Sequence, residues 1–307
     1  MPTPRLLLAL SAAALVAGSL VACSSGAIAP SGSPTAGAPI PVVASTDVWG
    51  SVASAIGGDR VAVESIIDDP DKDPHDYEAD AHNQLSISRA AVVIENGGGY
   101  DDFVDTMLSA AGNGTAKVID AVDLSGFTPD ASGDLNEHVW YDFPTVEKVV
   151  DAIESAYAGL DPADAATFTA NAAALKTRID ALVSQEGDLK AKYAGVGVSI
   201  TEPVPLYMLD AIGLDDLTPH DFSEAIENDT DVAPATLQQT LALYSGHQVK
   251  LLAYNEQTTG PQTQAVLDAA KQNGIAVVPV TETLPSGKDY IGWMTDNLNA
   301  IAAALGS

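Results

Sequence analysis

The chain has 307 residues, of which 42 are acidic and 13 are basic, and its formal net charge is −29. This negative balance disfavours nucleic acid and anionic lipid surfaces as partners and favours cations. A single cysteine, Cys23, excludes an intramolecular disulfide and a zinc site built from several cysteines.

The first 22 residues predict an export signal. Arg5 precedes an apolar run that ends in Ala22-Cys23, and a run of this length with one basic flanking residue is typical of a secretory signal and short for a membrane span. The end of the run resembles a bacterial lipobox, in which the cysteine is acylated and becomes the first residue of the mature chain. We therefore expect an extracytoplasmic lipoprotein, anchored to the cell membrane through lipid on Cys23.

The composition then divides the chain into a tether and a folded part. Residues 23–41 are rich in Ser, Gly, Pro and Ala, which is typical of a flexible tether. The rest is long enough for two lobes with cores of their own. We predict an N-terminal α/β lobe at 42–160, a linker helix at 161–194 and a C-terminal α/β lobe at 195–307.

Short apolar runs alternate with amphipathic segments on both sides of the linker, which indicates α/β lobes with parallel sheets covered by helices. In the first lobe the predicted strands are 41–45, 61–67, 91–95 and 117–121, and the predicted helices are 48–55, 83–89 and 102–110. In the second lobe the predicted strands are 197–200, 250–254 and 275–280, and the predicted helices are 205–212, 234–244, 261–272 and 289–305.

The segment between the lobes shows almost no strand signal from Pro144 to Tyr193. Asp161 before Pro162 is a favourable N-cap followed by a proline at the first helical position. These signals predict a helix over 162–193, about 48 Å long at ~1.5 Å per residue. A helix of this length would join the lobes as a stiff strut. Its apolar positions do not keep a clean heptad, which disfavours a coiled coil.

Four polar side chains are predicted to follow strands. His75 lies in an acidic segment after the second strand, and His138 precedes a helix that begins near Pro144. Glu202 and Glu282 stand just past two strands of the second lobe. Ligand sites of open α/β sheets lie at the carboxyl ends of the strands. Two imidazoles and two carboxylates that meet in a cleft between the lobes could bind a divalent cation.

Five short motifs, at 73–78, 138–142, 201–202, 254–257 and 281–283, stand in an order seen in one protein family. Over about residues 42–307 the chain resembles the metal-binding, solute-binding lipoproteins of zinc/manganese-type ABC importers. The resemblance implies two α/β lobes joined by one long rigid helix, with the metal ion held between them. The four ligands that it implies are His75, His138, Glu202 and Glu282.

The chain departs from the family pattern at two places. The fourth ligand of the family is commonly Asp, whereas Glu282 is one methylene longer. Zinc-specialised members often carry a third histidine where Glu202 stands, and a His-rich loop, whereas residues 123–137 are acidic and hold no histidine. Asn255 matches a motif position without an expected ligand role. The three remaining histidines, which match no ligand position and are expected at the surface or in loops, are His82, His220 and His247.

The expected function is capture of a divalent transition-metal ion outside the cytoplasm and its delivery to the cognate membrane permease of an ABC importer. Two imidazoles with two carboxylates favour Mn²⁺ or Fe²⁺ modestly, and Zn²⁺ is expected to bind tightly because affinity rises along the Irving–Williams order. We expect a monomer that binds no nucleic acid.

Two alternatives remain open from the residues. A metal-dependent extracytoplasmic hydrolase is one, since a His/carboxylate site with an open position could activate water. An adhesive surface lipoprotein with secondary metal binding is the other. The sequence shows no zinc-protease His-Glu-x-x-His motif, no Gly-x-Ser-x-Gly elbow and no P-loop, so we do not expect an enzyme.

Overall fold

The structure is a computed structural model that describes residues 37–69, 77, 80–129, 133 and 135–306. The predicted lipidation site Cys23 and the candidate ligand His75 lie outside the described residues.

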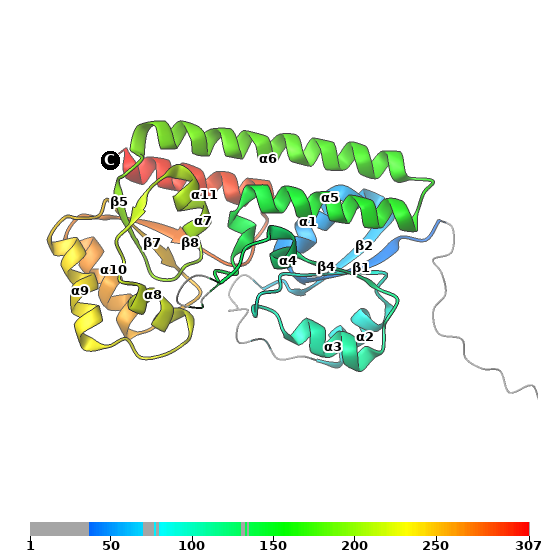
Figure 1. Ribbon diagram of the computed structural model, residues 1–307, viewed down its shortest axis with the longest axis horizontal. Coiled ribbons are helices and arrows are strands. Elements are labelled where there is room, and N and C mark those ends of the chain that lie inside the picture. Colours follow the sequence, from blue (N-terminus) through cyan, green and yellow to red (C-terminus); the bar gives the residue numbers. More distant parts are fainter. Residues whose placement is uncertain (1–36, 70–76, 78–79, 130–132, 134, 307) are drawn as a thin grey trace, which may run out of the picture. The chain divides into compact units, whose positions relative to one another are not determined.

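The first half of the described chain builds a parallel sheet with the strand order β2-β1-β3-β4 (Figure 1). Its elements are, in chain order, β1 (Ile40–Thr46), α1 (Asp47–Gly57), η1 (Gly58–Arg60), β2 (Val61–Ile67), α2 (Ala81–Arg89), β3 (Val92–Glu95), α3 (Phe103–Ala111), β4 (Lys117–Asp120), α4 (Ala121–Ser125), η3 (Val139–Tyr141) and α5 (Phe143–Leu160).

The second half begins with the longest helix, α6, and repeats the same topology in a parallel sheet with the order β6-β5-β7-β8. Its elements are α6 (Ala165–Tyr193), β5 (Gly197–Ile200), α7 (Leu206–Ile212), β6 (Asp215–Asp216), α8 (His220–Glu227), α9 (Pro234–Ser245), β7 (Leu251–Asn255), α10 (Pro261–Gln272), β8 (Ala276–Val280) and α11 (Tyr290–Leu305).

The central strands form because their sequences are apolar on both faces. All four residues of β3 and all five of β7 are buried, as expected for parallel strands covered by helices on both sides. In each sheet the chain first adds a strand on one side of the starting strand and then crosses to the other side. The carboxyl ends of β5 and β7 therefore flank a topological switch point, where open α/β sheets bind their ligands.

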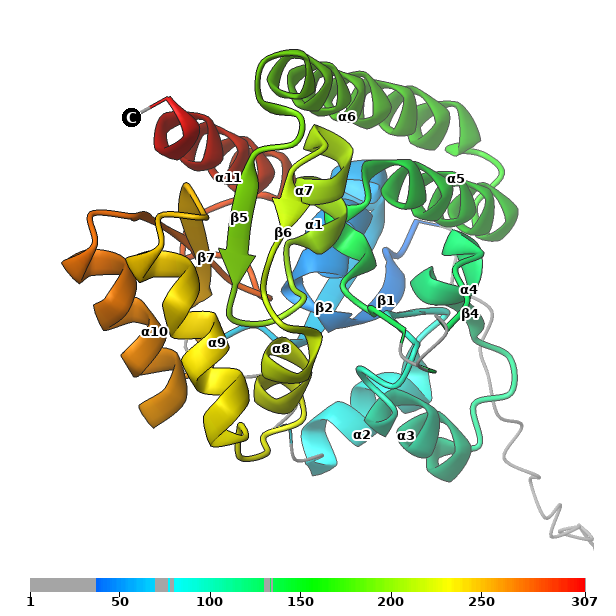
Figure 2. The same ribbon diagram turned by 60° about the vertical axis from the view of Figure 1, so that its left-hand side comes forward.

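Helix α6 packs along α5 and α11, and Figures 1 and 2 show it running beside both. Its 29 residues span about 44 Å. The buried positions alternate by four and three residues: Phe168, Ala172, Leu175, Ile179, Leu182, Glu186 and Leu189. The apolar heptad is therefore interrupted by one buried carboxylate, that of Glu186.

One hydrophobic core runs through both halves. Side chains of the first half, such as Val42 of β1 and Trp49 of α1, belong to the same buried cluster as Ile200 and Trp293 of the second half. The described residues from Gly37 onward accordingly form one compact unit. None of the helices in the described ranges combines the length and the apolar composition that a membrane span requires.

The predicted strands and helices are confirmed to within a few residues, with one wrong helix start. Helix α6 begins at Ala165, three residues after the predicted start at Pro162. Asp161 ends α5 instead, and its carboxylate accepts a hydrogen bond from the amide of Ala163 in the turn that leads to α6. The short elements α4, β6 and α8 were not predicted. The lobe boundaries at residues 160 and 195 stay a prediction.

Candidate metal centre

His138 is held in a loop that precedes η3, and its side chain is completely buried. The loop is tied to the second half of the chain. The Tyr141 hydroxyl donates to the carbonyl of Thr281 at 3.0 Å, and the Tyr290 hydroxyl donates to the carbonyl of Trp140 at 2.6 Å. We expected His138 to follow a strand directly. This was wrong, because α4 and a loop lie between it and β4.

The orientation of the His138 ring is set by Asn136. The side-chain amide of Asn136 donates to the Pro203 carbonyl at 3.1 Å, which leaves its oxygen to accept from His138 Nδ1 at 2.8 Å. The Nδ1 atom therefore carries the proton of the neutral ring, and Nε2 keeps its lone pair. This is the nitrogen that can bind a metal ion.

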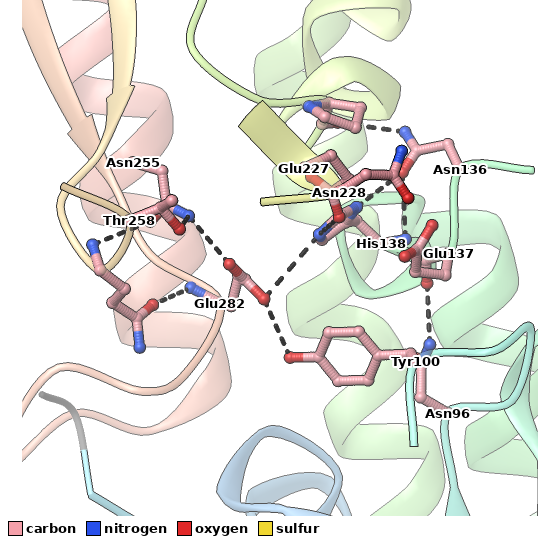
Figure 3. A network of polar contacts seen from close by, with 12 residues as sticks. Asn96, Tyr100, Asn136, Glu137, His138, Glu227, Asn228, Asn255, Thr258 and Glu282 are labelled. Carbon is pink, nitrogen blue, oxygen red and sulfur yellow. Dashed lines mark hydrogen bonds and ion pairs between the residues drawn. The ribbon is translucent and has the colours of Figure 1, made fainter. Parts of the chain in front are cut away.

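Glu282 lies opposite His138, two residues after β8, and is 1% exposed. Its Oε2 atom is 3.9 Å from His138 Nε2 and accepts a hydrogen bond from the Tyr100 hydroxyl at 3.2 Å. Its Oε1 atom accepts from the Asn255 amide at 2.8 Å (Figure 3). The carboxylate is thus fixed by both halves of the chain.

Glu202 follows β5 at the switch point and is 4% exposed. Burial, together with the negative charges of Glu227 and Glu282, raises the pKa of its carboxyl to about 9, although hydrogen bonds from Asn255 and Thr258 lower it. Within the described part of the chain, Glu202 Oε2 has no hydrogen-bond partner. Such a carboxyl becomes a stable anion only beside a positive charge.

Asn255 joins these two carboxylates, because its side chain bonds to both Glu202 and Glu282. It is completely buried at the end of β7, where its backbone amide donates to the Thr201 hydroxyl at 2.9 Å. Asn255, for which the sequence predicted no ligand role, therefore orients two candidate ligands.

Glu227, the last residue of α8, is a site residue that the sequence analysis missed. Its Oε1 atom lies 3.7 Å from His138 Nε2, and it groups with His138 and Glu137 so that one ligand atom of each lies within 4.8 Å of the others. The helix is short, but Phe222 and Ile226 are buried at a spacing of one turn after Pro219. That spacing is the signal in the sequence from which α8, and with it Glu227, could have been predicted.

A cavity of about 800 Å³ adjoins this centre and is lined from both halves, by Phe127, Glu137, Pro203, Tyr207, His220 and Glu227 among others. The histidines without an expected ligand role are exposed: His82 lies on α2 near Glu64, His220 begins α8, and His247 follows α9. The structure thus places His138, Glu202 and Glu282 near one another, with Glu227 beside His138, and their role as ligands stays a prediction.

The donor set fits a divalent transition-metal ion as cargo. Neutral imidazole binds Zn²⁺, Fe²⁺ and related ions, and carboxylates suit Mn²⁺ as well. A bound cation would also stabilise the buried carboxylates as anions.

Comparison with known proteins agrees with this chemistry. Residues 42–304 match the family model of ZnuA, the zinc-uptake complex component A periplasmic. The manganese-binding lipoprotein MntA of Bacillus subtilis (strain 168) is 24% identical over 279 residues, which cover 86% of this chain and 89% of MntA.

Solved structures show the same fold. A crystal structure of ZnuA matches with a TM-score of 0.70 and 19% identity, over 87% of this chain and 98% of ZnuA. FpvC from Pseudomonas aeruginosa in complex with Mn²⁺ matches with a TM-score of 0.71 and 23% identity, over 87% of this chain and 98% of FpvC. Because the family model spans nearly the whole folded part, the chain belongs to the ZnuA family and is an extracytoplasmic metal-binding component of an ABC importer.

Proposed function

We propose that His75, His138, Glu202 and Glu282 together bind one divalent transition-metal ion, which the protein delivers to its cognate permease. The observation that carries the proposal is the distance of 3.9 Å between His138 Nε2 and Glu282 Oε2, both from buried side chains. Two donor atoms that each lie about 2.1 Å from one ion are at most about 4.2 Å apart. One ion can therefore bind both atoms without rearrangement of the loops.

The cargo that we propose is Mn²⁺ ahead of Zn²⁺, with Fe²⁺ as a third candidate. A site with two imidazoles and two carboxylates is harder than one with three imidazoles, which favours Mn²⁺ and Fe²⁺. The relative MntA is a manganese-binding lipoprotein, and FpvC was solved with Mn²⁺. The matched family is named for zinc uptake, and the Irving–Williams order predicts tight Zn²⁺ binding in vitro.

In this proposal the protein works as a monomer, anchored through lipid on Cys23 by the tether at 23–41. The lobes at 42–160 and 195–307 hold the ion between them, and the linker helix at 161–194 fixes their spacing. Binding and release require no chemical turnover.

The ligand set is tested by titrating metal-free protein with Mn²⁺ and Zn²⁺. We expect His75→Ala and His138→Ala each to lower the affinity for both ions at least ~100-fold, because each removes a ligand. His82→Ala is the matched control, since His82 is exposed on α2. Wild-type affinity in both ligand variants would place the site elsewhere. Elemental analysis of protein purified from its native host identifies the physiological ion.

Anchoring is tested by Cys23→Ala, which removes the acylation site. We expect the variant to leave the membrane fraction and to keep wild-type metal affinity. Retention of the variant in detergent-free membranes would contradict the lipid anchor.

A further inference from the structure

Asn96 lies directly after β3 and is completely buried. Its backbone amide donates to the Asp101 carboxylate at 2.6 Å, and the amide of Gly97 donates to the same carboxylate at 2.8 Å. Its carbonyl accepts from the amide of Val122 on α4 at 2.8 Å. Contacts within the first half of the chain therefore fix the backbone at Asn96.

The orientation of the Asn96 side chain is set by Trp49 of α1. The indole N–H of Trp49 can only donate, and it donates to Asn96 Oδ1 at 3.3 Å between two buried side chains. The Nδ2 group therefore faces the other way, where it donates to the carbonyl of Gly97 at 3.2 Å and to that of Glu137 at 2.9 Å. An amide turned by half a rotation would oppose donor to donor and oxygen to oxygen, so Trp49 selects the orientation that reaches Glu137.

Asn96 reaches the metal centre at the carbonyl of Glu137, the residue before His138 (Figure 3). The same carbonyl accepts from the amide of Val139 at 2.7 Å, and His138 between them has φ −75° and ψ 47°. These are the features of an inverse γ-turn with His138 at its centre. The Asn96 side chain thus binds the turn at 137–139 from which the His138 ring projects.

This turn is held from both halves of the chain. Asn136 orients the ring through Nδ1 and is itself bonded to the Pro203 carbonyl in the second half. Asn96 supplies a contact from the first half, and it acts on the backbone of the turn. The contact with the ring determines which nitrogen is left to bind an ion, whereas the contact with the backbone determines where that nitrogen lies.

We propose that Asn96 is a positioning residue for metal binding, which holds the turn at 137–139 so that His138 Nε2 meets the ion, and that Trp49 acts through Asn96. The inference rests on the proposed function, in which His138 is a ligand. Residues that orient metal ligands typically contribute about 10- to 100-fold to affinity. Asn96 acts through a backbone carbonyl and shares the task with Asn136, which predicts the lower end of that range.

The first test is titration of metal-free Asn96→Leu with Mn²⁺ and with Zn²⁺. The change keeps the volume of the side chain and removes its hydrogen bonds, and we expect the affinity for both ions to fall about tenfold. Asn113→Leu is the matched control, because the Asn113 amide also donates to two carbonyls of the first half, those of Ile87 and Ala90 at 2.8 and 2.9 Å. It should change neither affinity.

Two outcomes of this titration would overturn the proposal. One is wild-type affinity in Asn96→Leu while His138→Ala binds weakly. The other is an equal loss in Asn96→Leu and Asn113→Leu, which would assign the effect to general destabilisation.

Trp49→Phe is a second variant, which removes the indole N–H and keeps an aromatic side chain in the core. We expect the affinity to fall about threefold, since one hydrogen bond to the Asn96 amide is lost. The double variant with Asn96→Leu should bind as weakly as Asn96→Leu alone, because the indole acts through the amide. Additive losses would contradict the role given to Trp49.

A measurement on metal-free protein separates this proposal from the proposed function. Long-range ¹H–¹⁵N NMR correlations of the His138 ring should show one tautomer, protonated at Nδ1, in wild type and in Asn113→Leu, and averaged signals in Asn96→Leu. Unchanged His138 signals in Asn96→Leu would overturn the positioning role while the four-ligand site stands. Averaged signals together with wild-type affinity in His138→Ala would instead overturn His138 as a ligand, and with it the proposed function.

Discussion

The two halves of the molecule position their site residues in different ways. In the second half, Glu202 and Glu282 stand two residues after β5 and β8, and one local side chain, Asn255, bonds to both. In the first half, His138 lies well beyond β4, and contacts with the second half fix it. The second half thus orients both carboxylates through a side chain of its own, with one further bond to Glu282 from Tyr100 of the first half. The His138 ring is oriented through Asn136, which bonds to the second half.

The contacts that fix the histidine loop converge on Asn136. Its side chain donates to the Pro203 carbonyl, and its own carbonyl accepts from the Tyr207 hydroxyl at 2.7 Å. Separation of the halves would break both bonds and free the His138 ring to turn.

The largest loss of metal affinity is expected when the hydrogen bonds of Asn255 to the two carboxylates of the second half are removed. Asn255→Leu keeps the volume of the side chain but takes away the amide that bonds to Glu202 and Glu282. We expect the affinity for Mn²⁺ and Zn²⁺ to fall about 100-fold, as for other residues that orient ligands. Isothermal titration calorimetry measures the change, with the exposed Asn299→Leu on α11 as the control. An affinity within twofold of wild type would show that the carboxylates do not need Asn255.

A smaller effect, on the stability of the fold, is expected from one buried carboxyl on α6, the helix that lies between the two sheets in the chain. Burial, with a smaller contribution from the negative charge of Asp142, raises the pKa of the Glu186 carboxyl on α6 to about 8. The folded state therefore binds this proton more tightly than the unfolded chain, whose carboxyl has its ordinary pKa near 4.5. Stability from this group is full below about pH 4.5 and is lost as the pH rises to about 8.

Glu186→Gln should remove that loss. We expect the variant to match wild type at pH 5 and to be more stable by about 1–3 kcal/mol at pH 8.5, measured by denaturant unfolding. Asp188→Asn, exposed on the same helix, should show no such difference. An equal effect of Glu186→Gln at both pH values would mean that the Glu186 carboxyl is not protonated in the folded state.

The smallest effect is expected from a single hydrogen bond that holds the histidine loop against the second half. Tyr207→Phe removes one hydrogen bond between the halves, and a bond of this kind contributes about 0.5–1.5 kcal/mol. We expect the metal affinity to fall about threefold to tenfold, mainly through faster release in stopped-flow measurements. Tyr157→Phe is the matched control, since its hydroxyl bonds to Ala53 within the first half. Equal release rates for the two variants would contradict a role for the loop contacts.

Much of the fold followed from local patterns in the sequence. Apolar runs such as Val92–Ile94 predicted buried strands, and prolines at 234 and 261 marked two helix starts that the structure confirms. The start of α6 was wrong because Asp161 was already used to end α5. A residue that can cap two helices is assigned only by the tertiary path of the chain.

The candidate site was predicted less completely, for a similar reason. Glu202 and Glu282 were found because they follow strands, which the sequence reveals. The ring orientation of His138 depends on Pro203, far away in the chain, and Glu227 sits on a helix of only eight residues, whose single apolar pair is a short signal. Contacts between distant segments leave no local signal in one sequence.

The core that runs through both halves has a consequence for cooperativity. Because Val42, Trp49, Ile200 and Trp293 belong to one buried cluster, neither half can melt without exposing apolar surface of the other, and that surface costs about 25 cal/mol per Å² in water. Calorimetry should therefore record a single transition with equal calorimetric and van't Hoff enthalpies. A fragment that ends at residue 160 should aggregate, because its share of that core would be exposed to water.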